Sequence, residues 1–184
     1  PASLSMSKVA VILLAAGESR RMGAANKLLL PVEGEPLVRR TARVLASLSR
    51  ARVTAVLGHE AEAVAAALSG LELTMTVNPD FAEGQRASVH HGFVHAGEAH
   101  SYMVTPADLP RLSAADCSAL VAAHGKAPDG AVTVPMRHGP AGPERGNPIM
   151  LSATARDDVI AGGINLGCRG LLDRRPDLIH IHTT

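Results

Sequence analysis

The apolar positions of the chain alternate between strand-like runs and stretches with helical spacing. Strand-like runs occur at residues 9–16, 52–57, 73–77, 102–105, 131–134, 148–151 and 178–182. Helical spacing is found at residues 36–49, 60–68, 85–94, 114–123, 154–160 and 168–174. Strands that alternate with helices predict a mostly parallel central sheet with helices on each face, which is an α/β fold of three layers.

The same pattern predicts one domain. It contains neither an internal repeat nor a linker long enough to separate two domains, and 184 residues with 46% apolar content suit a single core. We therefore expect residues 1–184 to form one domain, with residues 1–5 read as an addition ahead of a native Met6. Residues 137–146 are rich in glycine and proline, so we expect irregular structure there, either a mobile lid over a substrate or a long hairpin connection.

The segment that follows the first strand carries the most informative chemistry. The apolar run stops at Gly17, the next residues include Arg20 and Arg21, and Lys27 closes the segment. Backbone N–H groups and cations at the end of a strand favour an anion, and adjacent arginines suit the concentrated charge of a triphosphate. The glycine spacing is neither that of a Walker loop nor that of a dinucleotide fingerprint. The alternative is that the two arginines are solvated and pair with Glu18.

Polar residues follow several predicted strands at the point where each strand ends. These strand ends are Gly17, Gly58–His59, Asn78–Pro79 and Asp108. In open parallel sheets ligands bind outside the carboxyl ends of the strands, so we expect the four ends to converge on one crevice. A carboxylate held there can bind Mg²⁺ and neutralise a phosphate, although Asp108 could instead cap a helix or a turn.

The composition excludes several classes of function. A formal net charge of +1 and an aromatic content of 2% argue against a nucleic-acid partner. The first apolar run is shorter than the ~20 residues that span a bilayer, and no secretory cleavage site follows it. The two cysteines form no C-x-x-C motif and the nine histidines form no metal-ligand pattern, so neither a disulfide framework nor a zinc site is expected. We expect a cytoplasmic enzyme without nucleic-acid or membrane partners.

Five blocks of the sequence resemble the nucleotidyltransferases that attach a nucleotide to the molybdenum cofactor, above all the cytidylyltransferase type. In chain order they read LAAGESRRMGAANKLLLP, VNPDFAEGQ, ADLPRL, RGNPIML and GCRGLL, and the resemblance runs from about Val9 to about Leu172. It implies a three-layer Rossmann-like nucleotidyltransferase fold. It also implies Mg²⁺-dependent transfer of CMP from CTP to the phosphate of a molybdopterin-type small molecule, with release of pyrophosphate. A molybdoenzyme or its chaperone is the protein partner that it implies.

The resemblance also assigns roles to individual residues. It gives Arg21, Lys27 and Asp108 to catalysis, with Mg²⁺ held by Asp108 and Asn165. The nucleotide-binding residues that it implies are Leu14, Ala15, Ala16, Gly17, Ser19, Arg20, Gly23, Gly58, Asn78, Gly84, Gln85 and Ser88. The acceptor-binding residues that it implies are Gly146, Asn147, Pro148 and Arg169.

The chain departs from the family pattern at two positions. Asn165 stands where relatives commonly carry an aspartate, and Ala87 stands where they often carry a serine. Asparagine can still offer an oxygen to a metal but contributes no charge. Two alternatives therefore stand beside the leading one: transfer to a sugar phosphate or another small molecule, and a non-catalytic nucleotide- or cofactor-binding accessory factor for a molybdoenzyme. The dipeptide Ala15-Ala16 favours CTP, because the guanylyltransferase version of the loop tends to have glycine second.

Overall fold

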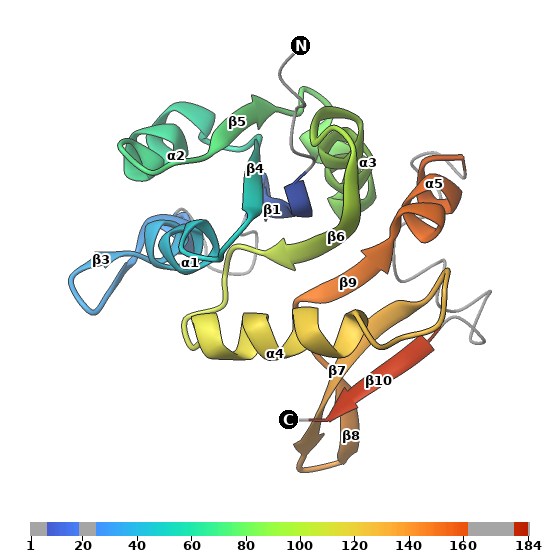
Figure 1. Cartoon of the computed structure of the whole chain (residues 1–184). Helices are drawn as coiled ribbons and strands as arrows, with labels where there is room; N and C mark the ends of the chain where they lie inside the picture. Colours follow the sequence, from blue (N-terminus) through green and yellow to red (C-terminus); the bar gives the residue numbers. More distant parts are fainter. Residues whose placement is uncertain (1–6, 19–24, 162–178, 184) are drawn as a thin grey trace.

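The computed structural model describes residues 7–18, 25–161 and 179–183 of the chain. Its central sheet has the strand order β10-β7-β9-β6-β1-β4-β5, and β8 pairs with β7 (Figure 1). The strands are β1 (Ser7–Ala15), β4 (Ala51–Leu57), β5 (Thr74–Val77), β6 (Ala99–Pro106), β7 (Val132–Gly139), β8 (Gly142–Arg145), β9 (Ile149–Ser152) and β10 (Ile179–Thr183). Strands β8 and β9 run antiparallel to their neighbours, and the other neighbouring pairs are parallel. The predicted α/β class with a mostly parallel sheet is confirmed.

Helices cover both faces of this sheet. The described helices are α1 (Leu37–Ala46), α2 (Ala61–Leu68), α3 (Gln85–His95), α4 (Ala114–His124) and α5 (Ala153–Ala161). Buried residues of α1, α2 and α4 form one apolar cluster with one face of the sheet, and those of α3 and α5 form a second cluster with the opposite face. The predicted three layers are therefore present.

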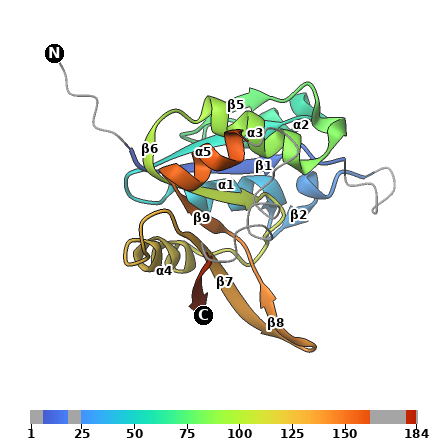
Figure 2. The ribbon, with the colours of Figure 1, turned by 90° about the vertical axis from the view of Figure 1, so that its right-hand side faces the viewer.

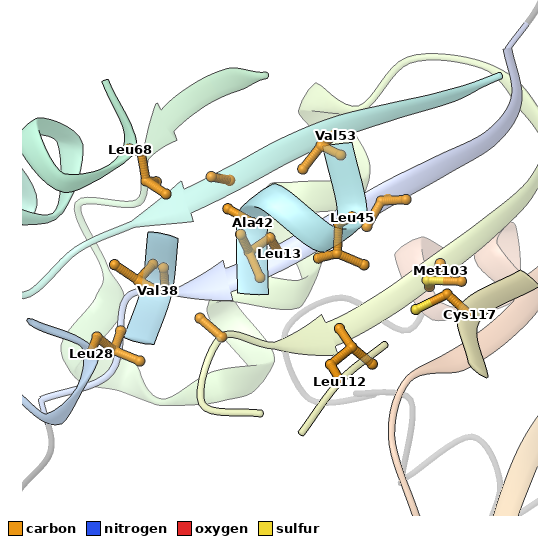
Figure 3. Packing of buried hydrophobic residues seen from close by; sticks show 14 of the residues in the cluster. Leu13, Leu28, Val38, Ala42, Leu45, Val53, Leu68, Met103, Leu112 and Cys117 are labelled. Carbon is orange, nitrogen blue, oxygen red and sulfur yellow. The ribbon is translucent and has the colours of Figure 1, made fainter. Parts of the chain in front are cut away.

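Strand β1 contributes to both clusters because its side chains alternate between the faces. Val11 and Leu13 belong to the cluster with α1, whereas Ile12 and Leu14 belong to the cluster with α3. Figure 3 shows Leu13 with the α1 residues of the first cluster. A strand that is buried on both faces must be apolar throughout, which explains the unbroken run that predicted it.

Most predicted elements are found within a few residues of their expected bounds, and the chief differences lie at strand ends. Strand β6 is longer than the predicted 102–105. The prediction located only its apolar part, because His100 and Ser101 near its start are polar. The short hairpin of β2 (Pro31–Val32) and β3 (Glu35–Pro36) precedes α1, so Pro36 lies just before the helix that it was expected to open. The predicted helix at 168–174 lies outside the described residues.

The prediction of irregular structure at 137–146 is wrong. This stretch forms most of an antiparallel ladder between β7 and β8, in which Met136 faces Arg145 and Arg137 faces Glu144. An ion pair of 2.9 Å joins Arg137 to Glu144 across the two strands. Figure 2 shows this hairpin extending away from the rest of the ribbon. Beyond Met136 the paired residues are charged residues, histidine, glycine and proline, none of them fully buried, so no apolar alternation marks the hairpin in the sequence.

Within the described ranges, the structure contains no helix with the length and apolar character needed to cross a membrane.

Candidate active site

The carboxyl ends of β1, β4, β5 and β6 meet at one edge of the sheet. Hydrogen bonds continue the strand pairing past these ends: Ala107 N donates to Leu14 O at 3.1 Å, His59 N to Ala16 O at 3.2 Å, and Asn78 N to Leu57 O at 2.8 Å. Because these bonds fix the first residues of each connecting segment, the four segments begin side by side. The four ends thus share one edge, as expected, but Gly58, His59 and Asn78 do not line the pocket at that edge.

A pocket of about 390 Å³ lies at this edge. Its lining residues are Leu14, Ala16, Gly17, Glu18, Lys27, Leu28, Phe81, Ala82, Gly84, Gln85, Ser88, Pro106, Ala107 and Asp108. Leu28 and Ala107 belong to the apolar cluster on the α1 face, whereas Leu14 and Ala16 belong to the cluster on the α3 face. The pocket therefore crosses the edge of the sheet from one face to the other, and its size is typical of a small-molecule site.

An ion pair joins the two described residues that the sequence assigned to catalysis. Lys27 Nζ donates to Asp108 Oδ2 at 2.5 Å, although the residues lie 81 positions apart. Lys27 begins the short helix η2 (Lys27–Leu29), where buried Asn26 accepts a hydrogen bond from Leu28 N at 3.1 Å. Asp108 follows buried Ala107, whose N–H is bound to β1. Buried neighbours thus fix both backbones, while the side chains stay 40% and 33% exposed. Of the predicted gathering, Gly17, Lys27 and Asp108 line one pocket, and Arg21 lies outside the described residues.

The charges around the pocket bear on what can bind there. The described ionisable lining residues are Glu18, Lys27 and Asp108, whose formal charges of −1, +1 and −1 sum to −1. A polyanion could enter such a pocket only with further positive charge. Arg20 and Arg21, which could supply it, lie outside the described residues.

The donor chemistry of the pocket fits a divalent cation. In the described part of the chain, no three His, Cys, Asp or Glu side chains lie close enough together to bind a metal ion. A metal ion there would need further ligands. Mg²⁺ is commonly held by one or two carboxylates together with substrate phosphates and water. Asp108 and Glu18 offer those carboxylates, and the predicted ligand Asn165 lies outside the described residues.

The amino end of α3 forms another part of the pocket wall. Gly84, Gln85 and Ser88 line it, and Gly84 precedes the helix with a φ of 103°, a left-handed conformation that favours glycine. Gly84 has no side chain to cap the first N–H groups of the helix. Those groups and the positive end of the helix dipole favour an anion at this wall.

Three residues predicted to bind the nucleotide lie behind the lining. Ala15 is fully buried and belongs to the cluster on the α1 face. Gly58 lies against Phe81, because a Cβ atom at Gly58 would stand 2.5 Å from the Cβ of Phe81. Asn78 is 2% exposed, donates from Nδ2 to Ser88 Oγ at 3.1 Å and accepts from Asp80 N at 3.0 Å. Gly58 and Asn78 therefore support the wall.

The described residues predicted to bind the acceptor lie elsewhere. Gly146, Asn147 and Pro148 connect β8 to β9, where Gly146 N donates to Pro135 O at 2.7 Å, and they do not line the pocket. The remaining predicted site residues lie outside the described part of the chain; they are Ser19, Arg20, Arg21, Gly23, Asn165 and Arg169.

The sequence reasoning missed six residues of the lining. They are Glu18, Leu28, Phe81, Ala82, Pro106 and Ala107. Glu18, Leu28 and Ala107 adjoin, along the chain, residues that were predicted, and Pro106 precedes Ala107. The other two lie in the VNPDFAEGQ block, on the three-residue helix η3 (Phe81–Glu83), which is too short to leave a periodic signal.

Comparison with known proteins gives the family. A profile of the MobA-like NTP transferase domain matches residues 11–178, which is nearly the whole chain. The chain belongs to this family. The family and the fold are those of a nucleotidyltransferase, and the finer assignment to the molybdenum cofactor cytidylyltransferase type stays a prediction.

Two curated relatives illustrate the range of sequence similarity. Nicotine blue oxidoreductase of Paenarthrobacter nicotinovorans is 29% identical over 173 residues, which cover 92% of this chain and 84% of that protein. The bifunctional protein GlmU of Sinorhizobium fredii is 36% identical over 114 residues, which cover 59% of this chain. The matched part is only 24% of that GlmU chain.

Solved structures share the fold at low sequence identity. Rv0371c from Mycobacterium tuberculosis superposes with a TM-score of 0.76 at 20% identity, covering 98% of this chain and 89% of that one. Its complex with manganese gives a TM-score of 0.71 at 18% identity, with coverage of 96% and 88%. CMP:2-keto-3-deoxy-manno-octonic acid synthetase complexed with CTP gives 0.72 at 14% identity, with coverage of 97% and 90%.

Proposed function

We propose that this chain is a Mg²⁺-dependent nucleotidyltransferase that transfers CMP from CTP to the phosphate of a molybdopterin-type acceptor. The observation that carries the proposal is the meeting of Lys27 with Asp108 in the pocket at the carboxyl ends of β1 and β6. A cation and a carboxylate at one strand edge, beside the amino end of α3, provide what a metal-bound triphosphate requires.

The transfer is an in-line displacement. An oxygen of the acceptor phosphate forms a bond to the α-phosphorus of CTP, the bond between the α-phosphorus and the bridging oxygen breaks, and pyrophosphate leaves with the bonding electrons. No side chain needs to form a covalent bond, so the protein contributes by positioning and by stabilising charge.

The described residues divide these tasks. Lys27 binds a phosphate oxygen as a compact point charge, and the N–H groups at the start of α3 favour the polyanion. Asp108 and, as the resemblance implies, Asn165 would hold Mg²⁺, and Glu18 lines the same pocket as Asp108. When bound, the metal ion neutralises phosphate charge and helps to orient the attack.

Two observations support CTP and a divalent metal. Ala16 lines the pocket after Ala15, as in the cytidylyltransferase version of the loop. Structures of the same fold have been solved with CTP and with manganese. We propose a molybdoenzyme or its chaperone as the recipient of the product.

The test is pyrophosphate release with Mg²⁺, molybdopterin and each of CTP, GTP, ATP and UTP. We expect release with CTP above the other three. Thermal stabilisation by the same nucleotides gives an independent measure of binding, because a ligand at 100 times its Kd adds ~2.7 kcal/mol to the free energy of unfolding. Binding without release would favour the accessory factor, and release only with a sugar phosphate would favour that acceptor class.

One relative favours a second candidate function. The similarity to nicotine blue oxidoreductase extends over 92% of this chain, further than the match to GlmU. The second candidate is therefore oxidation or reduction of nicotine blue or a similar compound in the same pocket. Dye decolorisation with NADH or NADPH, together with absence of pyrophosphate release, would favour this candidate.

A further inference from the structure

Phe81 is the one aromatic side chain among the described residues that line the pocket. The chain contains only one tyrosine, two phenylalanines and no tryptophan. Phe93 and Tyr102 are each 1% exposed and pack edge to face in the core, with ring centroids 5.8 Å apart. Phe81 is only partly buried. Its ring is thus the aromatic surface that remains available to a ligand.

The position of Phe81 is fixed by close packing on the strand ends. A Cβ atom at Gly58 would stand 2.5 Å from the Cβ and 2.7 Å from the Cγ of Phe81, and 2.9 Å from the Cβ of Ala16. The glycine therefore lets the ring lie directly on the backbone that follows β4. The ring of His59 lies on the same side, with its centroid 6.3 Å from that of Phe81.

Hydrogen bonds hold the segment that carries this ring. Buried Asn78 accepts from Asp80 N and donates to Ser88 Oγ, which ties the segment between β5 and α3 at both ends. Glu83 N donates to Asp80 O at 3.0 Å, and Gly84 N donates to Phe81 O at 3.1 Å, which closes the short helix η3. A ring held in this way loses little conformational freedom when a ligand packs on it.

Phe81 lies on the side of the pocket opposite Lys27 and Asp108. Phe81 packs against the cluster on the α3 face, together with Leu14 and Ala16. The segments of Lys27 and Asp108 are anchored by Leu28 and Ala107, which belong to the cluster on the α1 face. One side of the pocket thus carries the Lys27–Asp108 ion pair, and the other carries the flat ring of Phe81 beside the start of α3.

The geometry points to Phe81 as the residue on which the base of the bound nucleotide stacks, an inference that rests on the proposed function. Every base has a π-face, so stacking on an aromatic ring increases affinity without selecting one base. Phe81 therefore supplies affinity for all four nucleotides. Selection among them falls to the polar residues of the same wall, Gln85 and Ser88.

The experiment compares Phe81→Leu with Phe81→Tyr, which keeps the ring and serves as the matched control. Calorimetry measures the Kd of each variant for Mg²⁺–CTP, Mg²⁺–GTP and Mg²⁺–tripolyphosphate, the last of which has phosphates but no base. For Phe81→Leu we expect roughly tenfold weaker binding of CTP and of GTP, the range of one base–aromatic stack, with unchanged tripolyphosphate binding. Phe81→Tyr is expected to stay within about twofold of the unaltered protein for all three ligands.

Each outcome decides a different point. Equal losses for CTP and tripolyphosphate in Phe81→Leu would show a merely structural role and overturn the inference. An unchanged Kd for CTP in that variant would overturn it as well, while leaving the proposed function intact. Absence of CTP binding by the unaltered protein would overturn both. Loss of CTP affinity with retained GTP affinity would show base selection by Phe81 and contradict the base-independent stacking stated here.

Discussion

The Asp108 carboxylate accepts a hydrogen bond from the Lys27 ammonium. In the proposed function the two groups separate, because the carboxylate turns to the metal ion and the ammonium to a phosphate. In the ion pair, Lys27 therefore competes with the metal ion for Asp108, and Asp108 competes with the phosphate for Lys27. Binding of metal and nucleotide should therefore be mutually reinforcing, since one broken ion pair serves both.

A substitution at Lys27 tests this competition. Lys27→Gln removes the cation, so Mn²⁺ should bind more tightly in the absence of nucleotide. The gain should reach at most about fivefold, because partly exposed ion pairs contribute only ~0.2–1 kcal/mol. Nucleotide binding should weaken in the same variant. Paramagnetic resonance of free Mn²⁺ measures the first effect and calorimetry the second, with exposed Lys126→Gln as control. An unchanged Mn²⁺ affinity would show that Lys27 does not compete for the carboxylate.

A substitution at Asp108 tests the metal role itself. Asp108→Asn keeps the shape of the side chain but removes its charge, so pyrophosphate release should fall by on the order of 100-fold or more. The fold should persist, because the side chain is one-third exposed. Initial rates and circular dichroism are compared with those of Asp129→Asn, an exposed surface control. A rate near that of the unaltered protein would remove Asp108 from the metal site.

Single residues also show which parts of the site could be predicted from the sequence and which could not. The positions of Lys27 and Asp108 could be anticipated, because each lies within a block that resembles the family. Asn78 was expected to contact the nucleotide and is instead buried behind the wall. A residue that follows a strand end can lie in the lining or behind it, and only the path of the next segment decides which. The same segment carries Phe81 into the pocket.

At the scale of elements, α3 depends on a close approach to the sheet. A Cβ atom at Gly92 would stand 2.5 Å from Ile12 Cγ2 and 3.0 Å from Val56 Cγ2. Overpacking a core costs about 1–3 kcal/mol, whereas alanine favours a helix over glycine by ~1 kcal/mol. We expect Gly92→Ala to lower the free energy of unfolding by up to about 2 kcal/mol, as measured by urea denaturation.

The matched control for this substitution is Gly125→Ala at the end of α4. There a Cβ atom would meet backbone oxygens only at 3.5 and 3.6 Å, which is ordinary contact. The control variant should unfold at the same urea concentration as the unaltered protein or above it. Equal stability of Gly92→Ala and the control would show that α3 moves away from the sheet at little cost.

The same helix contains a histidine whose protonation opposes folding. Partial burial and the nearby charge of His95 lower the pKa of His91, with a smaller contribution from His90 and an opposing one from Asp80. His91 Nε2 also lies 2.9 Å from Thr76 Oγ1 of β5. Because the pKa in the folded state lies below the usual 6.5, the unfolded chain binds more protons as the pH falls below that value. This residue therefore reduces stability on the acid side.

His91→Gln removes the titration and keeps a group that can bind Thr76. Urea denaturation at pH 7.5 and at pH 5.5 should show a smaller loss of stability on acidification for the variant than for the unaltered protein. His100→Gln, on the exposed start of β6, is the control and should behave as the unaltered protein does. An identical pH dependence for all three proteins would contradict the prediction.

The elements also show which parts of the fold the apolar pattern could predict. It located the buried strands β1 and β4 because both lie between two layers of helices. The apolar pattern did not predict whether β9 runs parallel or antiparallel to its neighbours. Ile149–Ser152 is a short buried run, and such a run looks the same in either kind of strand. At 137–146 a hairpin connection was one of two alternatives, but the regular pairing of β7 with β8 was not predicted, because glycine and proline interrupt the pattern there.

At the scale of the whole molecule, the order β6-β1-β4-β5 accounts for the site. These four parallel strands bring their carboxyl ends to one edge, and the segments that follow them supply most of the pocket. The sequence could predict this half of the sheet from the alternation of strands and helices. The other half, where β9 and β8 reverse direction, required the structure.

The pocket is bordered by residues of two separate apolar cores, one on each face of the sheet. A small molecule bound there would contact residues anchored in both layers. Binding of nucleotide should therefore slow amide hydrogen exchange both in η2, on one face, and in the first turn of α3, on the other. The two segments should show the same dependence on nucleotide concentration. Protection confined to one of the two segments would mean that the ligand rests against a single layer.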